Sequence, residues 1–359
     1  AAAVSVAAAA DAGVVGIGLP GADESEGFDR THMDLPAAQR ETLAAVAEAN
    51  ANVVGVLVNG STVVLGDVVP HCRALVEAWL GGQAAGGAIA DVLTGRVNPS
   101  GRLAETFPHR LEDNSSYLNF PGDSQVVRYG EGIFIGYRGY DKTAQDVAFP
   151  FGFGLSYTSF ELSGLSVSTS GSVAEGTFGA TVTVTVTNTG DRDGAEVVQV
   201  YVEDLESTVP VPVRQLRGFA RVDLAAGESA EVSVDLDQRA FSFWSTVHGR
   251  WAVEAGDFVI AVGRNSRDLP LTETVAVEAP SLAAPLTAGS TLEEWMADET
   301  GRALLLEQLA AAGAPGLDDE LVAVIGNFPM TALANFNGML LDRPSLDRLA
   351  ARWQQTSPA

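Results

Sequence analysis

Cysteine is almost absent from this sequence of 359 residues, which contains only Cys72. A single cysteine excludes a disulfide within the chain, and the four scattered histidines beside it argue against a structural zinc site. We expect Cys72 to be a small buried hydrophobic residue rather than a catalytic thiol. The glycine-rich segment at 81–87 lacks the residues of a phosphate-binding loop, so nucleotide binding is not expected. We therefore expect neither a metal nor a cofactor.

Basic residues are also scarce, with 21 Lys and Arg against 46 Asp and Glu, which gives a formal net charge of −25. Such a surface repels phosphate backbones and anionic lipids, so neither nucleic acid nor a membrane is an expected partner. No apolar run reaches the roughly 18–20 residues that a membrane span needs. The chain begins at Ala1 without Met or a basic leader, and its first segments are typical of a piece of a longer polypeptide.

Apolar residues are plentiful, at 46% of the chain, and the length suits two or three domains. Within residues 1–112, the apolar runs at 14–19 and 53–58 predict buried parallel strands, and helical patterns occupy 35–50 and 83–94. This alternation predicts an α/β domain with flavodoxin-like layers. Its strands are too few for a complete sheet, so we expect a partial α/β sandwich.

The rest of the chain changes character twice. Residues 113–158 are rich in Gly, Asn, Tyr and Phe and are expected to form a connection that packs on the first domain. Strict alternation of Thr and Val at 181–187 is typical of a half-buried strand, and several such runs within 159–280 predict an immunoglobulin- or fibronectin III-like β-sandwich. Residues 285–359 are expected to form a short α-helical tail, which includes a helix over 292–309 capped by Thr291.

The segment whose residues best suit catalysis is 21–30, which directly follows the first predicted strand. Ligands of open α/β sheets bind beyond the carboxyl ends of the strands. Four acids and one arginine lie within eight residues there, and such crowding can keep one carboxyl protonated while another stays ionised. A solvated acidic loop would have the same composition, and spacing alone favours that simpler interpretation.

Four segments, in this order, resemble glycoside hydrolase family 3, the family of many β-glucosidases. They are residues 24–30 (ESEGFDR) with Asp34, Leu35 and Pro36 after them, 79–103 (beginning WLGGQ and ending NPSGRL), 131–138 (EGIFIGYR) and 149–158 (FPFGFGLSYT). Single glycine-rich matches occur by chance, so the shared order carries the resemblance.

The resemblance implies a (β/α)8 barrel followed by an α/β sandwich and, often, a fibronectin-like domain. It also implies a retaining mechanism, in which a barrel Asp is the nucleophile and a Glu of the sandwich is the general acid/base. By motif match that acid/base is Glu26, with Glu24 as the alternative. Asp29 and Arg30 would orient and tune it or help to bind the substrate.

No barrel is present in this sequence, so we expect a fragment of a retaining β-glycosidase that is inactive by itself. Its substrate would be a β-glucoside or an oligosaccharide, and its partner a (β/α)8 barrel domain from the same or another chain. A non-catalytic carbohydrate-binding or scaffolding module is the main alternative. An adhesin-like surface protein based on the β-sandwich is a third, which the order of the four motifs argues against.

Overall fold

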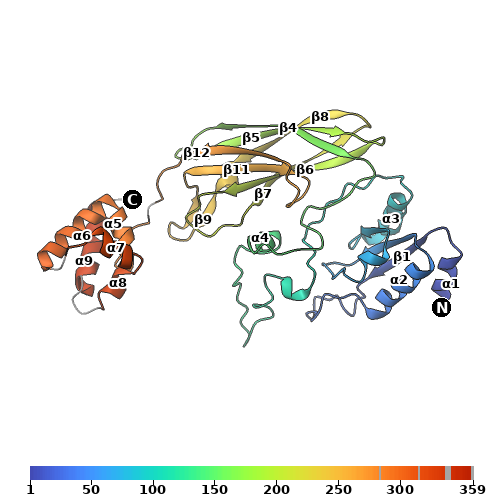
Figure 1. Cartoon of the computed structure of the whole chain (residues 1–359), viewed down its shortest axis with the longest axis horizontal. Coiled ribbons are helices and arrows are strands. Elements are labelled where there is room, and N and C mark those ends of the chain that lie inside the picture. The colour runs from blue at the N-terminus through green and yellow to red at the C-terminus, as the bar shows by residue number, and fades with distance from the viewer. Residues whose placement is uncertain (283, 314–315, 336–340, 357–359) are drawn as a thin grey trace. The chain divides into compact units, whose positions relative to one another are not determined.

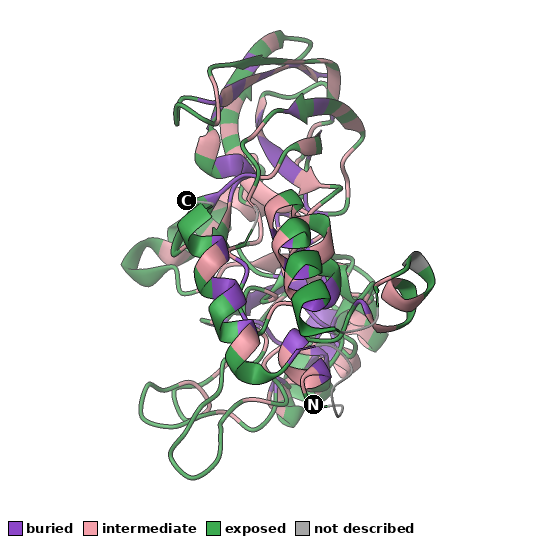
Figure 2. Ribbon diagram, turned by 90° about the vertical axis from the view of Figure 1, so that its left-hand side faces the viewer, coloured by how far each residue is buried: buried purple, intermediate pink, exposed green. Residues whose placement is uncertain are grey.

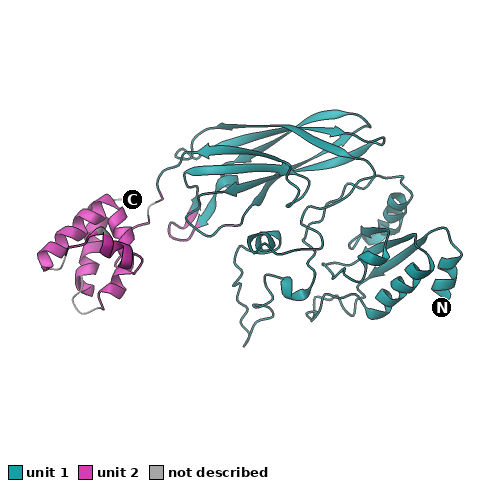
Figure 3. Ribbon diagram, viewed as in Figure 1, with its two compact units in different colours: residues 1–244, 251–281 teal, residues 245–250, 282–359 magenta. Residues whose placement is uncertain are grey.

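The computed structural model of the protein describes residues 1–282, 284–313, 316–335 and 341–356. The chain divides into two compact units, one made of residues 1–244 and 251–281 and the other of residues 245–250 and 282–359 (Figure 3). Over these described ranges, no helix is both long enough and apolar enough to cross a membrane.

The first part of the chain forms a small parallel sheet with the strand order β1-β2-β3 (Figure 1). Its strands are β1 (Gly13–Gly18), β2 (Val53–Val58) and β3 (Ala74–Glu77), and the helices of this part are α1 (Ala2–Ala8), α2 (Ala37–Ala49) and α3 (Ala85–Leu93). Leu43 and Val46 of α2 pack in one core with Ile17 of β1 and Leu57 of β2. Parallel strands with crossover helices confirm the α/β fold predicted from the alternating pattern.

Strand β3 is absent from the sequence prediction. It has only four residues, Ala-Leu-Val-Glu, and none of them is fully buried, so it lacks the long apolar run that identifies β1 and β2. Tertiary pairing forms this strand, because Val54–Leu57 of β2 supply its parallel partner.

The connecting segment that follows carries little regular structure. It includes the short helices η3 (Leu111–Asp113) and α4 (Tyr137–Lys142), after the single turns η1 (Val69–His71) and η2 (Gly82–Ala84). Phe107 pairs with Phe149 in an isolated bridge, and their rings meet edge to face with centroids 6.5 Å apart. Because Phe107 is a buried member of the α/β core, this contact holds the later part of the segment against that core.

The central part of the chain is a β-sandwich of two antiparallel sheets, β4-β5-β8 and β12-β11-β6-β7 (Figure 1). In β5 the valines are buried and the threonines only partly so, which confirms the strand predicted at 181–187. The strands are β4 (Phe160–Ser170), β5 (Gly179–Asn188), β6 (Gly194–Asp204), β7 (Gln215–Leu224), β8 (Ser229–Asp237), β11 (Gly256–Gly263) and β12 (Leu271–Val277). Near them lie η4 (Gln238–Phe241) and a hairpin of β9 (Phe243–Ser245) and β10 (Arg250–Ala252).

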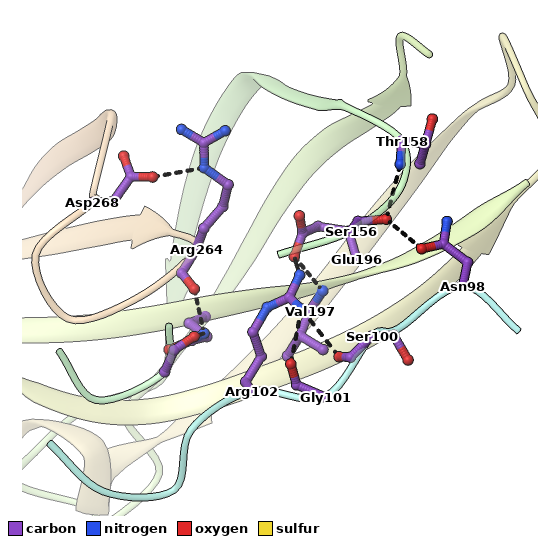
Figure 4. Close-up of polar contacts among 12 residues, drawn as sticks. Asn98, Ser100, Gly101, Arg102, Ser156, Thr158, Glu196, Val197, Arg264 and Asp268 are labelled. Atoms are coloured by element: carbon purple, nitrogen blue, oxygen red, sulfur yellow. Dashed lines mark hydrogen bonds and ion pairs between the residues drawn. The ribbon is translucent and has the colours of Figure 1, made fainter. Parts of the chain in front are cut away.

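A polar network links the α/β part to the sandwich (Figure 4). The side chain of Asn98 donates to the Asp193 carbonyl at 3.0 Å and accepts from the Ser156 hydroxyl at 2.9 Å. Arg102 forms an ion pair with Glu196 of β6, and both side chains are almost fully buried, with 9% and 4% exposed. The segment 98–102 is therefore a contact between the two parts within the first unit.

The C-terminal helices have a core of their own, built around Trp295 and Leu305. Buried and exposed positions alternate along these helices, as Figure 2 shows. The helices are α5 (Leu292–Ala297), α6 (Glu299–Ala312), α7 (Asp319–Ile325), α8 (Met330–Leu333) and α9 (Arg343–Thr356).

The predicted single helix over 292–309 is wrong, although Thr291 does cap its start through a capping box with Glu294. Asp298 has an extended backbone (φ −82°, ψ 123°) and ends α5. Its side chain accepts from the Gly301 amide at 2.6 Å and so caps α6. Aspartate competes well for free N–H groups at a helix start, which is why the chain breaks there.

Candidate active site

The acidic loop begins where β1 ends, at the carboxyl edge of the parallel sheet. Gly18 lies so close to β2 that a Cβ atom on it would be 2.0 Å from the Val58 carbonyl oxygen. Its amide donates to Gln39 Oε1 of α2 at 2.8 Å. The start of the loop is therefore fixed by both the neighbouring strand and the following helix.

Glu26 is exposed at the middle of this loop. Among the described residues its carboxyl has no hydrogen-bond or ion-pair partner, and the nearby Gly27 amide donates to Ser25 Oγ at 3.1 Å instead. Asp29 is also exposed. A proton donor needs direct access to its substrate, and the position of Glu26 provides that access.

The loop is anchored on both sides of Glu26 by the turn after β2, residues 59–62. Glu24 Oε1 accepts from the Gly60 amide at 2.8 Å and lies 3.5 Å from Ser61 Oγ. Arg30 Nη2 donates to Ser61 Oγ at 2.7 Å and to the Thr62 carbonyl at 3.3 Å. Within the described part of the chain Arg30 makes no ion pair with an acid of its own loop, so its contacts orient the loop and do not neutralise a carboxyl.

Glu77, at the end of β3, is a residue of this edge that the sequence analysis missed. Burial raises its pKa to about 7, against the opposing effect of N–H groups from Trp79 and Asn59. The Trp79 amide donates to Glu77 Oε1 at 2.8 Å, and Asn59 Nδ2 donates to Oε2 at 3.3 Å. An acid that ends a short apolar run, two residues before a tryptophan, was the available signal.

Trp79 and Cys72 are partly buried against the hydrophobic core, so Cys72 is less buried than predicted. Both pack against the buried residues of the α/β part, and the ring centroids of Trp79 and Phe107 lie 6.0 Å apart. Cys72 faces the backbone of β2, because a Cβ on Gly55 would be 2.7 Å from its sulfur. Burial raises the pKa of this thiol, which makes it a poor nucleophile.

The edge of the sheet thus presents two exposed carboxyls, Glu26 and Asp29, on an anchored loop. In the described ranges, no group of three or more His, Cys, Asp or Glu side chains is arranged to hold a metal ion. An accessible carboxyl can give or take a proton. A covalent intermediate of a retaining glycosidase needs a second carboxyl across the sugar, about 5–5.5 Å from the first.

Two domain families match the chain. The glycosyl hydrolase family 3 C-terminal domain matches residues 1–157, and the fibronectin type III-like domain matches residues 196–266. The first match contains the acidic loop and the anchoring turn, and the second lies within the β-sandwich. Both agree with the family resemblance and the fold class predicted from the sequence.

Several known proteins are similar to this chain. An exo-alpha-(1->6)-L-arabinopyranosidase of Bifidobacterium longum is 46% identical over 333 residues, which cover 93% of this chain and 43% of that protein. Thermostable beta-glucosidase B of Acetivibrio thermocellus is 44% identical over 350 residues, 96% of this chain and 46% of that protein.

A solved structure agrees with these relatives. The crystal structure of the Bifidobacterium adolescentis GH3 beta-glucosidase matches with a TM-score of 0.78 and 46% identity, over 84% of this chain and 44% of that one. The chain spans less than half the length of these three proteins. It belongs to glycoside hydrolase family 3, of which it carries the C-terminal domain and the fibronectin type III-like domain.

Proposed function

We propose that this chain supplies the general acid/base of a retaining β-glycosidase, and that Glu26 is that residue. The observation that carries the proposal is the exposed Glu26 carboxyl at the carboxyl edge of the sheet, on a loop anchored through Glu24 and Arg30. Glu24 is the weaker candidate, because its carboxylate is already occupied by the Gly60 amide.

In the proposed reaction, Glu26 first donates its proton to the glycosidic oxygen of the departing group. Its carboxylate then removes a proton from the water that attacks the glycosyl-enzyme. We assign the nucleophile, an Asp, to a (β/α)8 barrel from the same or another chain. General acid catalysis alone contributes about 10²–10⁴-fold and forms no covalent intermediate, so the isolated chain is expected to be inactive.

A partner domain is supported by the large apolar side chains that the connecting segment leaves in water. Leu118 and Tyr129 are 92% and 81% exposed, and Phe28 of the acidic loop is 50% exposed. The other exposed members of this set are Tyr117, Phe120, Val126, Val127, Ile133, Ile135, Leu155 and Tyr157. Exposed apolar surface of this kind commonly marks an interaction site, and we assign the barrel to it.

The proposed substrate is a β-glucoside or a β-linked oligosaccharide, in keeping with the names of several relatives. The arabinopyranosidase of B. longum is as similar as the β-glucosidases, so an L-arabinopyranoside is the competing substrate. Assaying the assembled enzyme on nitrophenyl glycosides of both sugars distinguishes them.

The role of Glu26 is tested by the dependence of the rate on the leaving group. A 2,4-dinitrophenolate leaves without protonation, whereas a phenolate or an alkoxide needs an acid. In the enzyme assembled from this chain and its barrel, Glu26→Gln should lower kcat/KM for phenyl glycosides by about 10²–10⁴-fold and leave dinitrophenyl glycosides much less affected.

The controls are Glu24→Gln and Glu41→Gln, the latter at an exposed position on α2. Glu41→Gln should behave as the parent enzyme. If Glu24→Gln shows the leaving-group dependence and Glu26→Gln does not, the assignment moves to Glu24. If neither variant shows it, this chain does not supply the acid.

A further inference from the structure

The proposed reaction leaves one partly buried carboxyl at this edge without a role. Glu77 ends β3, the third strand of the parallel sheet, and its carboxyl accepts from the Trp79 amide and from Asn59 Nδ2. It makes no ion pair with any of the described residues. Among the described residues, the Glu77 carboxyl is therefore held only by hydrogen bonds from N–H donors.

Asn59 links this carboxyl to the turn that anchors the acidic loop. Its side chain is fully buried, and Nδ2 donates both to Glu77 Oε2 at 3.3 Å and to the Ser61 carbonyl at 2.9 Å. The buried Oδ1 has no hydrogen-bond partner among the described residues. The orientation of the Asn59 amide thus depends on its Nδ2 bonds, and Glu77 provides one of the two acceptors.

The turn at 59–62 contacts the loop on both sides of Glu26. Gly60 donates to Glu24, and Ser61 accepts from Arg30. The contact with Glu24 is close, because a Cβ on Gly60 would lie 2.9 Å from the Glu24 Oε1 atom. A small shift of this turn would therefore move both anchors of the loop.

The backbone next to Glu77 is strained, which agrees with a site where geometry is held in place. Trp79 has φ +49°, a left-handed conformation that a bulky residue rarely adopts. Such conformations persist where surrounding contacts hold them, and they gather near functional sites. The bond from the Trp79 amide to Glu77 Oε1 is one of these contacts.

We propose that Glu77 is a positioning residue for the general acid/base. It fixes the amide of Asn59, Asn59 fixes the turn at 59–62, and the turn holds Glu24 and Arg30 on either side of Glu26. This inference rests on the proposed role of Glu26, and it assigns a function to a carboxyl that does not touch the substrate. Loss of the hydrogen bond between Glu77 and Asn59 should shift the Glu26 carboxyl slightly from its position. Such a shift should slow only the steps that need proton transfer.

Glu77→Gln tests the proposal with a minimal change. The variant keeps the volume of the side chain, but its amide can accept from only one of the two donors, Trp79 or Asn59. In the assembled enzyme we expect kcat/KM on phenyl glycosides to fall roughly tenfold to a hundredfold, and on dinitrophenyl glycosides less than about twofold. Glu41→Gln serves as the matched control, with no change on either substrate.

Asn59→Ala, alone and combined with Glu77→Gln, tests whether Glu77 acts through Asn59. If Glu77 acts through Asn59, the leaving-group dependence of the double variant should equal that of Asn59→Ala alone, because the two changes break the same path. Additive losses would contradict the route. In the 359-residue chain alone, hydrogen exchange of the Gly60 amide should accelerate in Glu77→Gln, and this readout needs no activity.

The outcomes separate this inference from the proposed function. Suppose that Glu26→Gln shows leaving-group dependence, but Glu77→Gln lowers kcat/KM equally on phenyl and dinitrophenyl glycosides or changes it on neither. Glu77 is then only structural, and the inference is wrong. If Glu26→Gln itself shows no dependence, the proposed function is wrong. Unchanged exchange at Gly60 would overturn the inference even where no activity is measured.

Discussion

At the scale of single residues, burial separates two carboxyls that the same edge of the sheet carries. Glu26 is exposed and unpaired within the described part of the chain, whereas burial raises the pKa of Glu77 to about 7. Motif resemblance is enough to point to Glu26 from the sequence alone. It does not point to Glu77, because the environment of that carboxyl comes from Asn59 and Trp79, which lie 18 residues before it and two after it.

The raised pKa of Glu77 predicts a pH dependence of stability. The pKa rises from an ordinary value of 4.5 to about 7 on folding, so the folded chain binds more protons between these values. The stability that this proton contributes is therefore fully present below pH 4.5 and is lost as the pH rises through 7. Glu77→Gln removes the ionisation, and the variant should melt at a higher temperature than the parent at about pH 8 but not at about pH 4.5.

Calorimetric melting of both proteins across roughly pH 4.5–8 measures this difference. Glu41→Gln, at an exposed position, should track the parent at every pH. A gap between Glu77→Gln and the parent that stays constant with pH would contradict the burial argument, because a constant gap reports packing rather than ionisation.

At the scale of elements, the sequence predicted those with a long, regular pattern. The valines of β5 and the apolar run of β2 are such patterns, and both form the expected strands. Strand β3 was not predicted, because four residues are too few to show a regular hydrophobic pattern. The break at Asp298 was not predicted, because in the sequence a capping aspartate looks like an ordinary surface acid of a helix. Tertiary pairing decided the first case and a side-chain hydrogen bond the second.

The contact between the α/β part and strand β6 makes a prediction at this scale. Arg102→Met leaves the carboxylate of Glu196 buried without its partner, since Glu196 is only 4% exposed. Removing one partner of a buried ion pair costs about 3–5 kcal/mol. The first transition in denaturant unfolding of the chain should move to lower concentration by a corresponding amount.

Arg96→Met provides the control, because the ion pair of Arg96 with Asp91 leaves the arginine 78% exposed. Exposed pairs contribute about 0–1 kcal/mol, so this variant should unfold almost as the parent does. Equal losses in the two variants would show that burial of the Arg102 pair does not determine its contribution.

At the scale of the whole molecule, the order of four motifs identified the family, and the comparisons confirm it. The matched domain families end at residue 266, but the A. thermocellus relative aligns over 350 residues, so the helical tail has a counterpart there. No nucleophile was predicted in this chain, because the family resemblance assigns it to a (β/α)8 barrel. The domain boundaries predicted from composition stay predictions.

The central claim is that Glu26 acts as the general acid/base of a retaining enzyme, and trapping with azide tests it most directly. In Glu26→Ala the missing carboxylate leaves room for a small anion, which needs no base to attack the glycosyl-enzyme. With a dinitrophenyl glycoside, the assembled enzyme carrying this variant should turn over faster in azide and release the β-glycosyl azide, seen by NMR. If azide leaves the rate unchanged and only free sugar forms, or if Glu24→Ala yields the β-azide instead, the claim is contradicted.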